Sequence, residues 1–249
     1  MVRTKTDYSM ELFESHFSNL RGNLYEDDDG SYSLFTGKGR SHHINYLTFK
    51  ALFENMKTSK NLVILESGIA SRGTQSTYLF NELVRKYGGR FWSVDTDANL
   101  VESHRGNMCP ATQLVCDDSV AFFKRWITDD YKSTANDYKS TANVIYLDSY
   151  DLDFYDPEPS GNHGLAEYNA LIPAIKKDTL LLIDDTPATP EWLDTRGQLY
   201  VDMVDFYTNT GIMPGKGMYV LDRVNNAEKI IHNYQLLYRF TGKPGQHVL

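Results

Sequence analysis

The sequence lacks the features that mark several classes of protein. It has only two cysteines among 249 residues, and the spacing of Cys109 and Cys116 fits neither a disulfide framework nor a metal site, which favours a reducing compartment. Its 25 basic residues are outnumbered by 33 acidic ones, so we expect no binding to nucleic acid or to an anionic membrane surface. No apolar run reaches the roughly 18 residues of a membrane helix, and residues 1–10 lack the apolar centre of a signal peptide. We therefore expect a soluble, cytoplasmic protein.

Apolar runs and helical patterns alternate along the middle of the chain. Each apolar run is followed by a segment with the 3.6-residue spacing of an amphipathic helix. Repeated units of this kind predict an α/β fold, with a doubly wound and mostly parallel sheet that carries helices on both faces. The five predicted parallel strands are residues 61–66, 90–95, 112–116, 144–148 and 179–185.

The end of the chain breaks this pattern. A predicted helix at residues 195–208 is followed by two strand-like segments, 217–224 and 233–240. The second segment ends close to the last residue, which leaves little room for another crossover helix. We therefore predict that the last two strands are antiparallel and that they complete a seven-stranded sheet.

The first 58 residues are predicted to form a helical extension to the rest of a single domain, residues 59–249. One helical pattern covers residues 8–20, and another begins after Ser41, a predicted N-cap, with a polar loop between the two. The two histidines after Ser41 would then lie in the first turn of the second helix. Histidines at such positions are more often surface or capping residues than ligands.

A seven-residue segment, DYKSTAN, occurs twice in succession, at residues 130–136 and 137–143. Two copies are too few for a solenoid, and tyrosine and alanine alone cannot form a heptad seam. We interpret the repeat as a duplicated surface segment that lengthens a connection. An extension that binds a partner protein is the alternative.

Acidic residues stand at the carboxyl ends of four of the five predicted strands. They are Glu66, Asp95, Asp148 and the pair Asp184 and Asp185. The carboxyl ends of parallel strands meet at one edge of the sheet, which is where open α/β folds bind their ligands. A carboxylate is costly at this edge unless it binds a hydroxyl, a cation or a metal, so the pattern predicts a functional site.

A glycine-bearing turn follows the first of these strands. Gly68 and Gly73 flank the residues IASR, a spacing that matches neither the dinucleotide fingerprint G-x-G-x-x-G nor a phosphate-binding loop that ends in Gly-Lys-Ser/Thr. A tight turn with no ligand is one reading of the glycines. Glu66, however, would repel a pyrophosphate and suits a cationic ligand. Asp95 comes 29 residues later, where an acid can accept both hydroxyls of an adenosine ribose.

Together these motifs resemble class I S-adenosylmethionine-dependent methyltransferases, in particular the metal-dependent O-methyltransferases of the macrocin-type sugar and cephalosporin-hydroxylase-like branch. The resemblance covers residues 60–240 and lies in the order and spacing of loose motifs. It implies a Rossmann-like sheet with the strand order 3-2-1-4-5-7-6 and the last strand antiparallel. The matching segments are ESGIASRGTQS, SVDTD, CDDSVAFF, LDSYD and LLIDDT.

The resemblance also implies how S-adenosylmethionine would bind. Asp95 would be the ribose acid, while Asp97 would cap the following helix. Asp118 and Ser119 would edge the adenine. The remaining cofactor-binding residues would come from the first motif, namely Glu66, Gly68, Ser71 and Gly73.

A divalent metal is the next implication, with Asp148, Asp184 and Asp185 as its ligands. Three converging carboxylates would repel one another and have raised pKa values unless a cation lay among them. An all-oxygen set suits Mg²⁺ or Ca²⁺ rather than Zn²⁺, and a bound metal would lower the pKa of a substrate hydroxyl. The alternative is a metal-free substrate site in which Asp185 only caps the next loop.

Methyl transfer to a hydroxyl needs a base, and three residues are candidates. Asp151 lies three residues after Asp148, where catechol-type relatives carry a lysine. His163 follows Asn162, a predicted helix cap, and resembles the histidine of hydroxylase-like relatives. A helix-start histidine with no catalytic task is equally consistent with the sequence. Asp148 itself is the third candidate.

The sequence therefore predicts an S-adenosylmethionine-dependent O-methyltransferase that acts on a small-molecule or saccharide hydroxyl with Mg²⁺ assistance. A small phenol is the second choice of acceptor. An NAD-type dinucleotide oxidoreductase and a non-catalytic scaffold protein are the alternatives from other classes. The sequence does not fix the oligomeric state, and a homo-oligomer is compatible with it.

Overall fold

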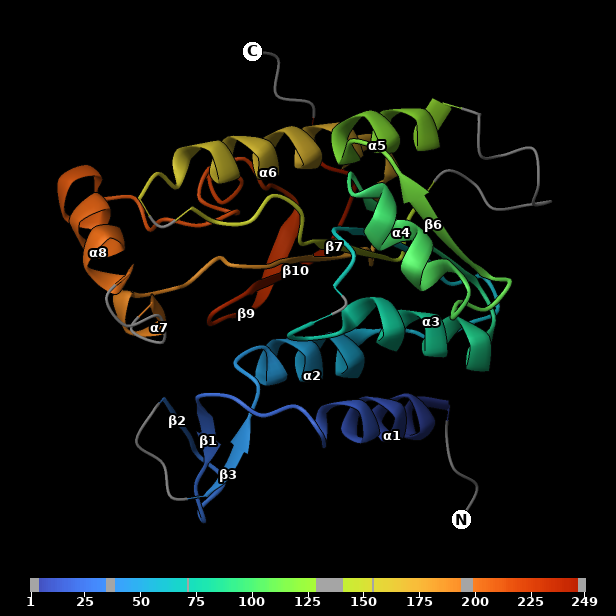
Figure 1. Ribbon diagram of the computed structural model, residues 1–249, viewed down its shortest axis with the longest axis horizontal. Coiled ribbons are helices and arrows are strands. Elements are labelled where there is room, and N and C mark those ends of the chain that lie inside the picture. The colour runs from blue at the N-terminus through green and yellow to red at the C-terminus, as the bar shows by residue number, and fades with distance from the viewer. Residues whose placement is uncertain are drawn as a thin grey trace.

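In a computed structural model, the centre of the protein is a seven-stranded sheet with helices on both faces. Figure 1 shows the strands lying between an upper and a lower layer of helices. In spatial order the strands are β6 (Thr112–Cys116), β5 (Arg90–Asp95), β4 (Val63–Ser67), β7 (Val144–Leu147), β8 (Leu180–Ile183), β10 (Leu236–Phe240) and β9 (Ala227–His232). The structure describes residues 5–34, 39–70, 72–128, 141–153, 155–193 and 199–245.

The order and direction of the strands confirm the predicted doubly wound sheet. β4 pairs in parallel with β5 and β7, β5 with β6, and β7 with β8, whereas β10 is antiparallel to both β8 and β9. In chain order this is the arrangement 3-2-1-4-5-7-6, with the last strand antiparallel. Every residue of β4, β7 and β8 is buried, which explains why these strands read as continuous apolar runs in the sequence.

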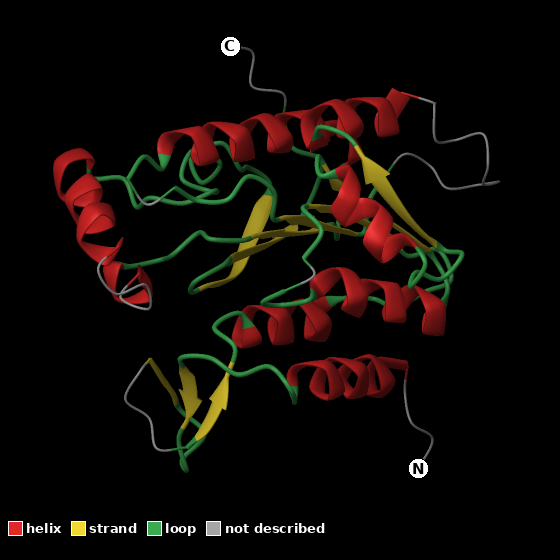
Figure 2. Cartoon of the chain, viewed as in Figure 1, coloured by secondary structure: helices red, strands yellow, loops and turns green. Residues whose placement is uncertain are grey.

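Two hydrophobic clusters hold the helices against the two faces of the sheet, and Figure 2 shows both helical layers. Among the described residues the helices are α1 (Lys5–Phe17), α2 (Tyr46–Asn55), α3 (Ser76–Tyr87), α4 (Ala98–Arg105), α5 (Ser119–Thr128), α6 (Glu158–Leu171), α7 (Pro190–Leu193) and α8 (Leu199–Thr210), with a 3₁₀ turn, η2 (Ile172–Ala174), after α6. Phe122 of α5 and Tyr168 of α6 belong to one cluster. Phe13 of α1, Phe49 of α2 and Phe80 of α3 belong to the other. None of the described helices is both long and apolar enough to cross a membrane.

The N-terminal region contains a small sheet that the sequence did not predict. Its strands are β1 (Leu24–Glu26), β2 (Tyr32–Leu34) and β3 (Arg40–His42). They pair antiparallel in the order β2-β1-β3, in a segment that was expected to be a polar loop. Strands this short show no readable alternation of polar and apolar residues, so the sequence pattern could not mark them.

The predicted start of the second helix was wrong. Ser41 lies in β3, where its hydroxyl accepts from the amide of Gly22 and donates to the carbonyl of the same residue, and α2 begins only at Tyr46. His42 is fully buried, with its Nε2 3.0 Å from Oε2 of Glu26, and does not lie in a first helical turn. Pairing with a distant strand thus overrides the local N-cap signal of Ser41.

The sixth strand in chain order also lies elsewhere than predicted. Residues 217–224 form turns, in which the amides of Val220 and Val224 donate to the carbonyls of Gly217 and Val220. The strand is β9, which follows these turns. Three of its six residues, AEKIIH, are polar, and the strand is partly exposed at the edge of the sheet, so it carries no long apolar run.

Helix α6 begins earlier than predicted. Its first residue is Glu158, with Pro157 at the N-cap and Pro159 in the first turn, where proline costs no backbone hydrogen bond. Asn162 therefore lies inside the helix and does not cap it.

Most of the repeated DYKSTAN segment, residues 130–140, lies outside the described residues, and its interpretation stays a prediction. The end of the second copy leads directly into β7. There the amide of Asn143 donates to the carbonyl of Val63 over 2.9 Å, and its side-chain oxygen accepts from the amide of Val63 over 2.8 Å.

Candidate active site

Two adjoining pockets open at the carboxyl ends of the parallel strands, the edge at which the sequence predicts a site. One has a volume of about 670 Å³ and lies over the ends of β4 and β5; we call it the Asp95 pocket. The other has a volume of about 710 Å³, lies over the ends of β7 and β8, and is lined on its other side by N-terminal residues; we call it the Asp184 pocket. Arg72, Asp148 and Asp151 line both, so the two pockets meet at these residues.

The glycine turn after β4 contributes to both pockets. Gly68 has a φ of 82°, and a Cβ there would lie 2.4 Å from the carbonyl oxygen of Asp148, so only glycine lets the ends of β4 and β7 approach this closely. Gly68 lines the Asp95 pocket, as predicted for a donor-binding residue. Gly73 instead lines the Asp184 pocket. Ser71 lies outside the described residues.

Asp95 is held at the end of β5 by the backbone. Its two carboxylate oxygens accept hydrogen bonds from the amides of Ile69, over 3.0 Å, and Asp97, over 2.9 Å. A carboxylate has further lone pairs available, and those of Asp95 face a pocket. Asp97 caps α4 by accepting from the amides of Asn99 and Leu100, which confirms its predicted role.

Asp118 and Ser119 line the same pocket at the start of α5. Asp118 is exposed and accepts a hydrogen bond from the amide of Ala121 over 2.8 Å, which fixes its side chain at the first turn of the helix. Ser119 is buried, with its hydroxyl 3.0 Å from Nε2 of His163. The structure therefore brings Asp95, Asp118 and Ser119 together in one pocket.

Glu66 is placed differently from the prediction. Its side chain has no exposed surface, and its carboxylate accepts hydrogen bonds from the hydroxyls of Ser76, Thr77 and Ser93 over 2.6–2.7 Å. Burial raises the pKa of Glu66 to about 7, although these three hydrogen bonds oppose the shift. Glu66 thus ties the start of α3 to β4 and β5, and it lines neither pocket.

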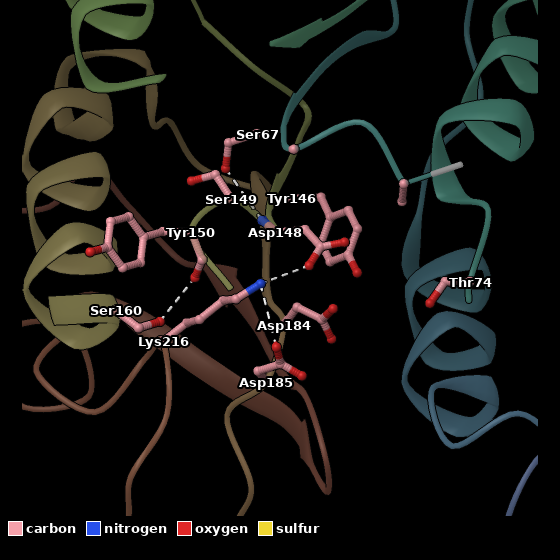
Figure 3. Close-up of polar contacts among 12 residues, drawn as sticks. Ser67, Thr74, Tyr146, Asp148, Ser149, Tyr150, Ser160, Asp184, Asp185 and Lys216 are labelled. Atoms are coloured by element: carbon pink, nitrogen blue, oxygen red, sulfur yellow. Dashed lines mark hydrogen bonds and ion pairs between the residues drawn. The ribbon is translucent and has the colours of Figure 1, made fainter. Parts of the chain in front are cut away.

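The ends of β7 and β8 bring Asp148, Asp184 and Asp185 together, and we call these three residues the aspartate centre. The ammonium of Lys216 lies among them, with Nζ 2.9 Å from Oδ1 of Asp148 and 3.5 Å from Oδ2 of Asp185 (Figure 3). Only 3% of the Lys216 side chain is exposed. The sequence reasoning required a cation at this place but missed that the chain supplies one.

Electrostatics within the aspartate centre shift the pKa values of Asp148 and Asp184 in opposite directions. Burial, and then the nearby charge of Asp184, raise the pKa of Asp148 well above its usual range. Burial would also raise the pKa of Asp184, but its hydrogen bond with Asp148, the Lys216 ammonium and the Gln235 amide together lower it. Burial alone would lower the pKa of Lys216, but the charges of the three carboxylates raise this pKa overall, so the lysine side chain stays protonated.

Three further residues that the sequence reasoning missed hold the centre in place. Gln235 donates to Oδ1 of Asp184 over 2.6 Å, and Asn45 donates to the same oxygen over 3.4 Å. Tyr234 donates to Oδ1 of Asp185 over 2.5 Å. Asn45 and Tyr234 also line the Asp184 pocket. They come from segments far from β8 in the chain, and no local pattern marks them.

The aspartate centre does not fit the divalent metal that the resemblance implies. Within the described residues, no group of three or more His, Cys, Asp or Glu side chains is arranged to hold a metal ion. The ammonium of Lys216 occupies the space between the carboxylates of Asp148 and Asp185, where a metal would have to lie. A metal and this lysine side chain therefore exclude one another.

The three candidate bases fall in different places. Asp148 and Asp151 lie where the two pockets meet. His163 lines the Asp95 pocket, with Nε2 3.0 Å from the Ser119 hydroxyl and 3.1 Å from the Ser149 hydroxyl. A hydrogen bond with Glu167 raises the pKa of His163, against the effect of burial. The structure therefore places His163 away from the Asp184 pocket.

Left-handed backbone conformations surround the site. Tyr150 follows β7 with a φ of 57°, Asp185 follows β8 with a φ of 38°, and Gln75 precedes α3 with a φ of 51°. Residues other than glycine seldom adopt these angles, and such strain is concentrated at functional sites.

Comparisons with known proteins give no family for the chain. No family model matches it, and no curated protein matches it. Solved structures with a similar arrangement include the MycE methyltransferase of the mycinamycin pathway with Mg and S-adenosylhomocysteine, at 14% identity over 76% of this chain and 48% of that one, with a TM-score of 0.42. The citrinin polyketide synthase CMeT domain matches at 12% identity over 81% and 52% of the two chains, with a TM-score of 0.43.

Human N-acetylserotonin methyltransferase in complex with S-adenosylmethionine matches at 11% identity, over 79% of this chain and 52% of that one, with a TM-score of 0.43. The chain thus spans about half the length of these three structures. At such identities and scores the comparisons assign no activity.

Proposed function

We propose that the protein is an S-adenosylmethionine-dependent methyltransferase, with the methyl donor in the Asp95 pocket and the acceptor in the Asp184 pocket. The observation that carries the proposal is the meeting of the two pockets at Asp148, Asp151 and Arg72. A donor sulfonium in one pocket can face an acceptor atom in the other across this junction, as in-line transfer requires.

Charge in the Asp95 pocket favours this donor over a dinucleotide. Asp95, Asp118, Asp148 and Asp151 all line the pocket. Carboxylates favour a cationic sulfonium and amino group, whereas they repel a pyrophosphate. Asp95 would accept the ribose hydroxyls, and Asp118 and Ser119 would contact the adenine.

The lining of the Asp184 pocket favours a hydroxyl-rich acceptor, such as a saccharide, over a small phenol. Carboxylates, the side chain of Asn45 and the hydroxyl of Thr74 form much of its wall and can bind several hydroxyl groups. The apolar residues Ile44 and Leu152 and the rings of His43 and Tyr234 also line the pocket, but charged and amide side chains outnumber them. We therefore propose O-methylation of a polar acceptor.

In the proposed reaction the acceptor oxygen attacks the methyl carbon, the carbon–sulfur bond breaks, and S-adenosylhomocysteine leaves. Asp148 would take the hydroxyl proton, because it lies where the two pockets meet and Lys216 holds its carboxylate there through a 2.9 Å hydrogen bond. Asp151, which is exposed at the junction, would position the acceptor. Metal assistance is not part of this proposal, since Lys216 supplies the cation at the aspartate centre.

Titration calorimetry with S-adenosylhomocysteine and with NADH tests the proposal. We expect binding of S-adenosylhomocysteine that Asp95→Ala weakens by about 10- to 100-fold, since a charged acceptor loses its hydrogen bonds. Asp97→Ala is the matched control, because Asp97 caps α4 and lines neither pocket. Binding of NADH without binding of S-adenosylhomocysteine would instead support a dinucleotide oxidoreductase.

A further inference from the structure

We infer that Lys216 is a built-in replacement for a divalent cation, so that the aspartate centre of the native protein excludes metal ions. The observation behind this is the position of the ammonium, which lies within 2.9–3.5 Å of two of the three carboxylates. The catalytic consequence rests on the proposed methyl transfer, whereas the exclusion of metal does not.

The backbone around Lys216 is fixed on the side of β8. The amide of Lys216 donates to the carbonyl of Asp185 over 3.0 Å, and the amide of Gly217 donates to the Thr186 hydroxyl over 3.0 Å. A Cβ at Gly215 would lie 2.4 Å from the carbonyl oxygen of Asp185, and one at Gly217 would lie 2.7 Å from the Thr186 side chain. Glycine on each side of the lysine thus lets the segment lie directly against the end of β8.

Helix α6 fixes the same segment from the other side. A Cβ at Gly164 would lie 2.2 Å from the carbonyl oxygen of Lys216, and one at Gly161 would lie 2.7 Å from the side chain of Met218. The segment is therefore held between β8 and α6, and all its residues from Gly215 to Met218 are buried. Because the backbone of Lys216 is fixed and buried in this way, its side chain is held with the ammonium at the aspartate centre.

Metal and ammonium cannot share the centre. Mg²⁺ binds carboxylate oxygens at about 2.0–2.1 Å and needs a complete set of ligands around it. The Nζ of Lys216 already lies in hydrogen-bond contact with Oδ1 of Asp148, and the same Nζ lies 3.5 Å from Oδ2 of Asp185 (Figure 3). A metal could bind only after the lysine side chain had left, which would place an unpaired ammonium in the protein interior.

The replacement changes what the centre can do. A metal offers open positions at which an acceptor hydroxyl can bind and lose its proton. Lys216 is not among the residues that line the Asp184 pocket, so it reaches an acceptor only through the carboxylates of Asp148 and Asp185. It is therefore a positioning residue, which holds the carboxylates of Asp148 and Asp185 in place beside the pocket, where Asp148 can act as a base.

Binding of Mn²⁺, followed by electron paramagnetic resonance, tests the inference without reference to catalysis. We expect the wild-type protein and Lys216→Arg to leave Mn²⁺ free, whereas Lys216→Ala binds one ion per chain and loses it when Asp148→Asn is added. Lys57→Ala is the matched control, because Lys57 pairs with Asp178 over 3.2 Å on the exposed surface, and its removal should create no site.

One Mn²⁺ bound to the wild-type protein and lost in Asp148→Asn would overturn the inference, as would a folded Lys216→Ala that binds none. If Lys216→Ala does not fold, the wild-type protein and Lys216→Arg decide the question. The inference is supported if neither protein binds Mn²⁺, and it is refuted if either protein binds an ion at Asp148.

Methyl transfer provides a second readout. Transfer by the wild-type protein should be unchanged in excess EDTA, and transfer by Lys216→Ala should fall by about 10²-fold and recover in part with Mn²⁺ or methylammonium. Loss of wild-type transfer in EDTA would contradict the inference. A wild-type protein that binds no S-adenosylhomocysteine would refute the proposed function, and the Mn²⁺ measurement would still decide the role of Lys216.

Discussion

Glu66 and the aspartate centre bury carboxylates at neighbouring strand ends in two different ways. Glu66 accepts hydrogen bonds from the hydroxyls of Ser76, Thr77 and Ser93, and burial raises its pKa to about 7. The aspartate centre instead contains the ammonium of Lys216, and its three carboxylates line a pocket. The first arrangement joins elements of the fold, and the second presents charge to a ligand.

The difference shows that an acid at a strand end predicts a buried charge but does not by itself predict contact with a ligand. Neutral hydroxyls stabilise a buried carboxylate incompletely, so such a group tends towards its protonated form. In the aspartate centre the hydrogen bond with Asp148 and the ammonium of Lys216 lower the pKa of Asp184 despite its burial, whereas the pKa of Asp148 stays raised. Substitutions at Asp148, Lys216 and Glu66 each alter one side of this difference.

The largest effect is expected from Asp148→Asn, which keeps the shape of the side chain but cannot take up a proton. Methyl transfer should fall by about 10²- to 10⁴-fold, the usual contribution of a general base, while binding of S-adenosylhomocysteine, whose sulfur carries no positive charge, should weaken by a much smaller factor. Transfer from labelled donor and calorimetry measure the two quantities. Asp153→Asn is the control, since Asp153 is exposed on the same loop and accepts from the amide of Tyr155. Equal losses in the two variants would contradict the role of Asp148.

Removing Lys216 should have the next largest effect, in this case on folding. Lys216→Ala leaves the buried Asp184 and the largely buried Asp148 and Asp185, each 16% exposed, without their cation, and breaking a buried ion pair costs about 3–5 kcal/mol of unfolding free energy. Lys57→Ala should cost little or nothing, because its pair with Asp178 is exposed. Urea unfolding of the two variants measures the difference, and similar losses would show that the burial of Lys216 has no energetic consequence.

Glu66→Gln should change how stability depends on pH. Between the ordinary value of 4.5 and the raised pKa of about 7, the folded protein holds a proton on Glu66 that the unfolded chain has lost. Stability therefore falls as pH rises through this interval, by roughly 3 kcal/mol for this group. Urea unfolding at pH 5 and pH 8 should show a smaller loss for the variant than for the wild type. An identical loss in both proteins would mean that Glu66 ionises normally.

The smallest effect is expected from His163→Gln, because His163 lines the donor pocket and not the acceptor pocket. Loss of its hydrogen bonds with Ser119 and Ser149 should weaken binding of S-adenosylhomocysteine by up to about tenfold and leave kcat nearly unchanged. The pH profile of kcat separates this from the role of a base. If kcat collapses and the profile loses its limb near neutral pH, His163 takes the proton after all.

Local patterns predicted much of the fold. β5 and β6 match the predicted strands 90–95 and 112–116, because each is a short segment with apolar residues that is bounded by helical patterns on both sides. β3 and β9 were missed, because their residues pair with distant strands and carry no apolar run of their own. Whether such segments form strands depends on pairing with distant parts of the chain, which the local sequence pattern does not reveal.

The same limit applies to the site, where the acidic residues could be predicted but their bonding partners could not. The rule that strand ends meet at one edge brought Asp95, Asp148, Asp184 and Asp185 to adjoining pockets, as predicted. The partners of these acids could not be predicted in the same way. The need for a cation among three carboxylates follows from Coulomb repulsion alone, but its source, Lys216, comes 31 residues after Asp185 in a segment with no strand or helix pattern.

A crystal structure of the protein soaked with S-adenosylhomocysteine tests the two-pocket account most directly. We predict density for the adenosine in the Asp95 pocket, with the ribose hydroxyls in hydrogen-bond contact with Asp95. The sulfur should lie at the junction of the two pockets and face Asp148. Density in the Asp184 pocket, a sulfur directed away from Asp148, or no bound ligand at a saturating concentration would contradict the account.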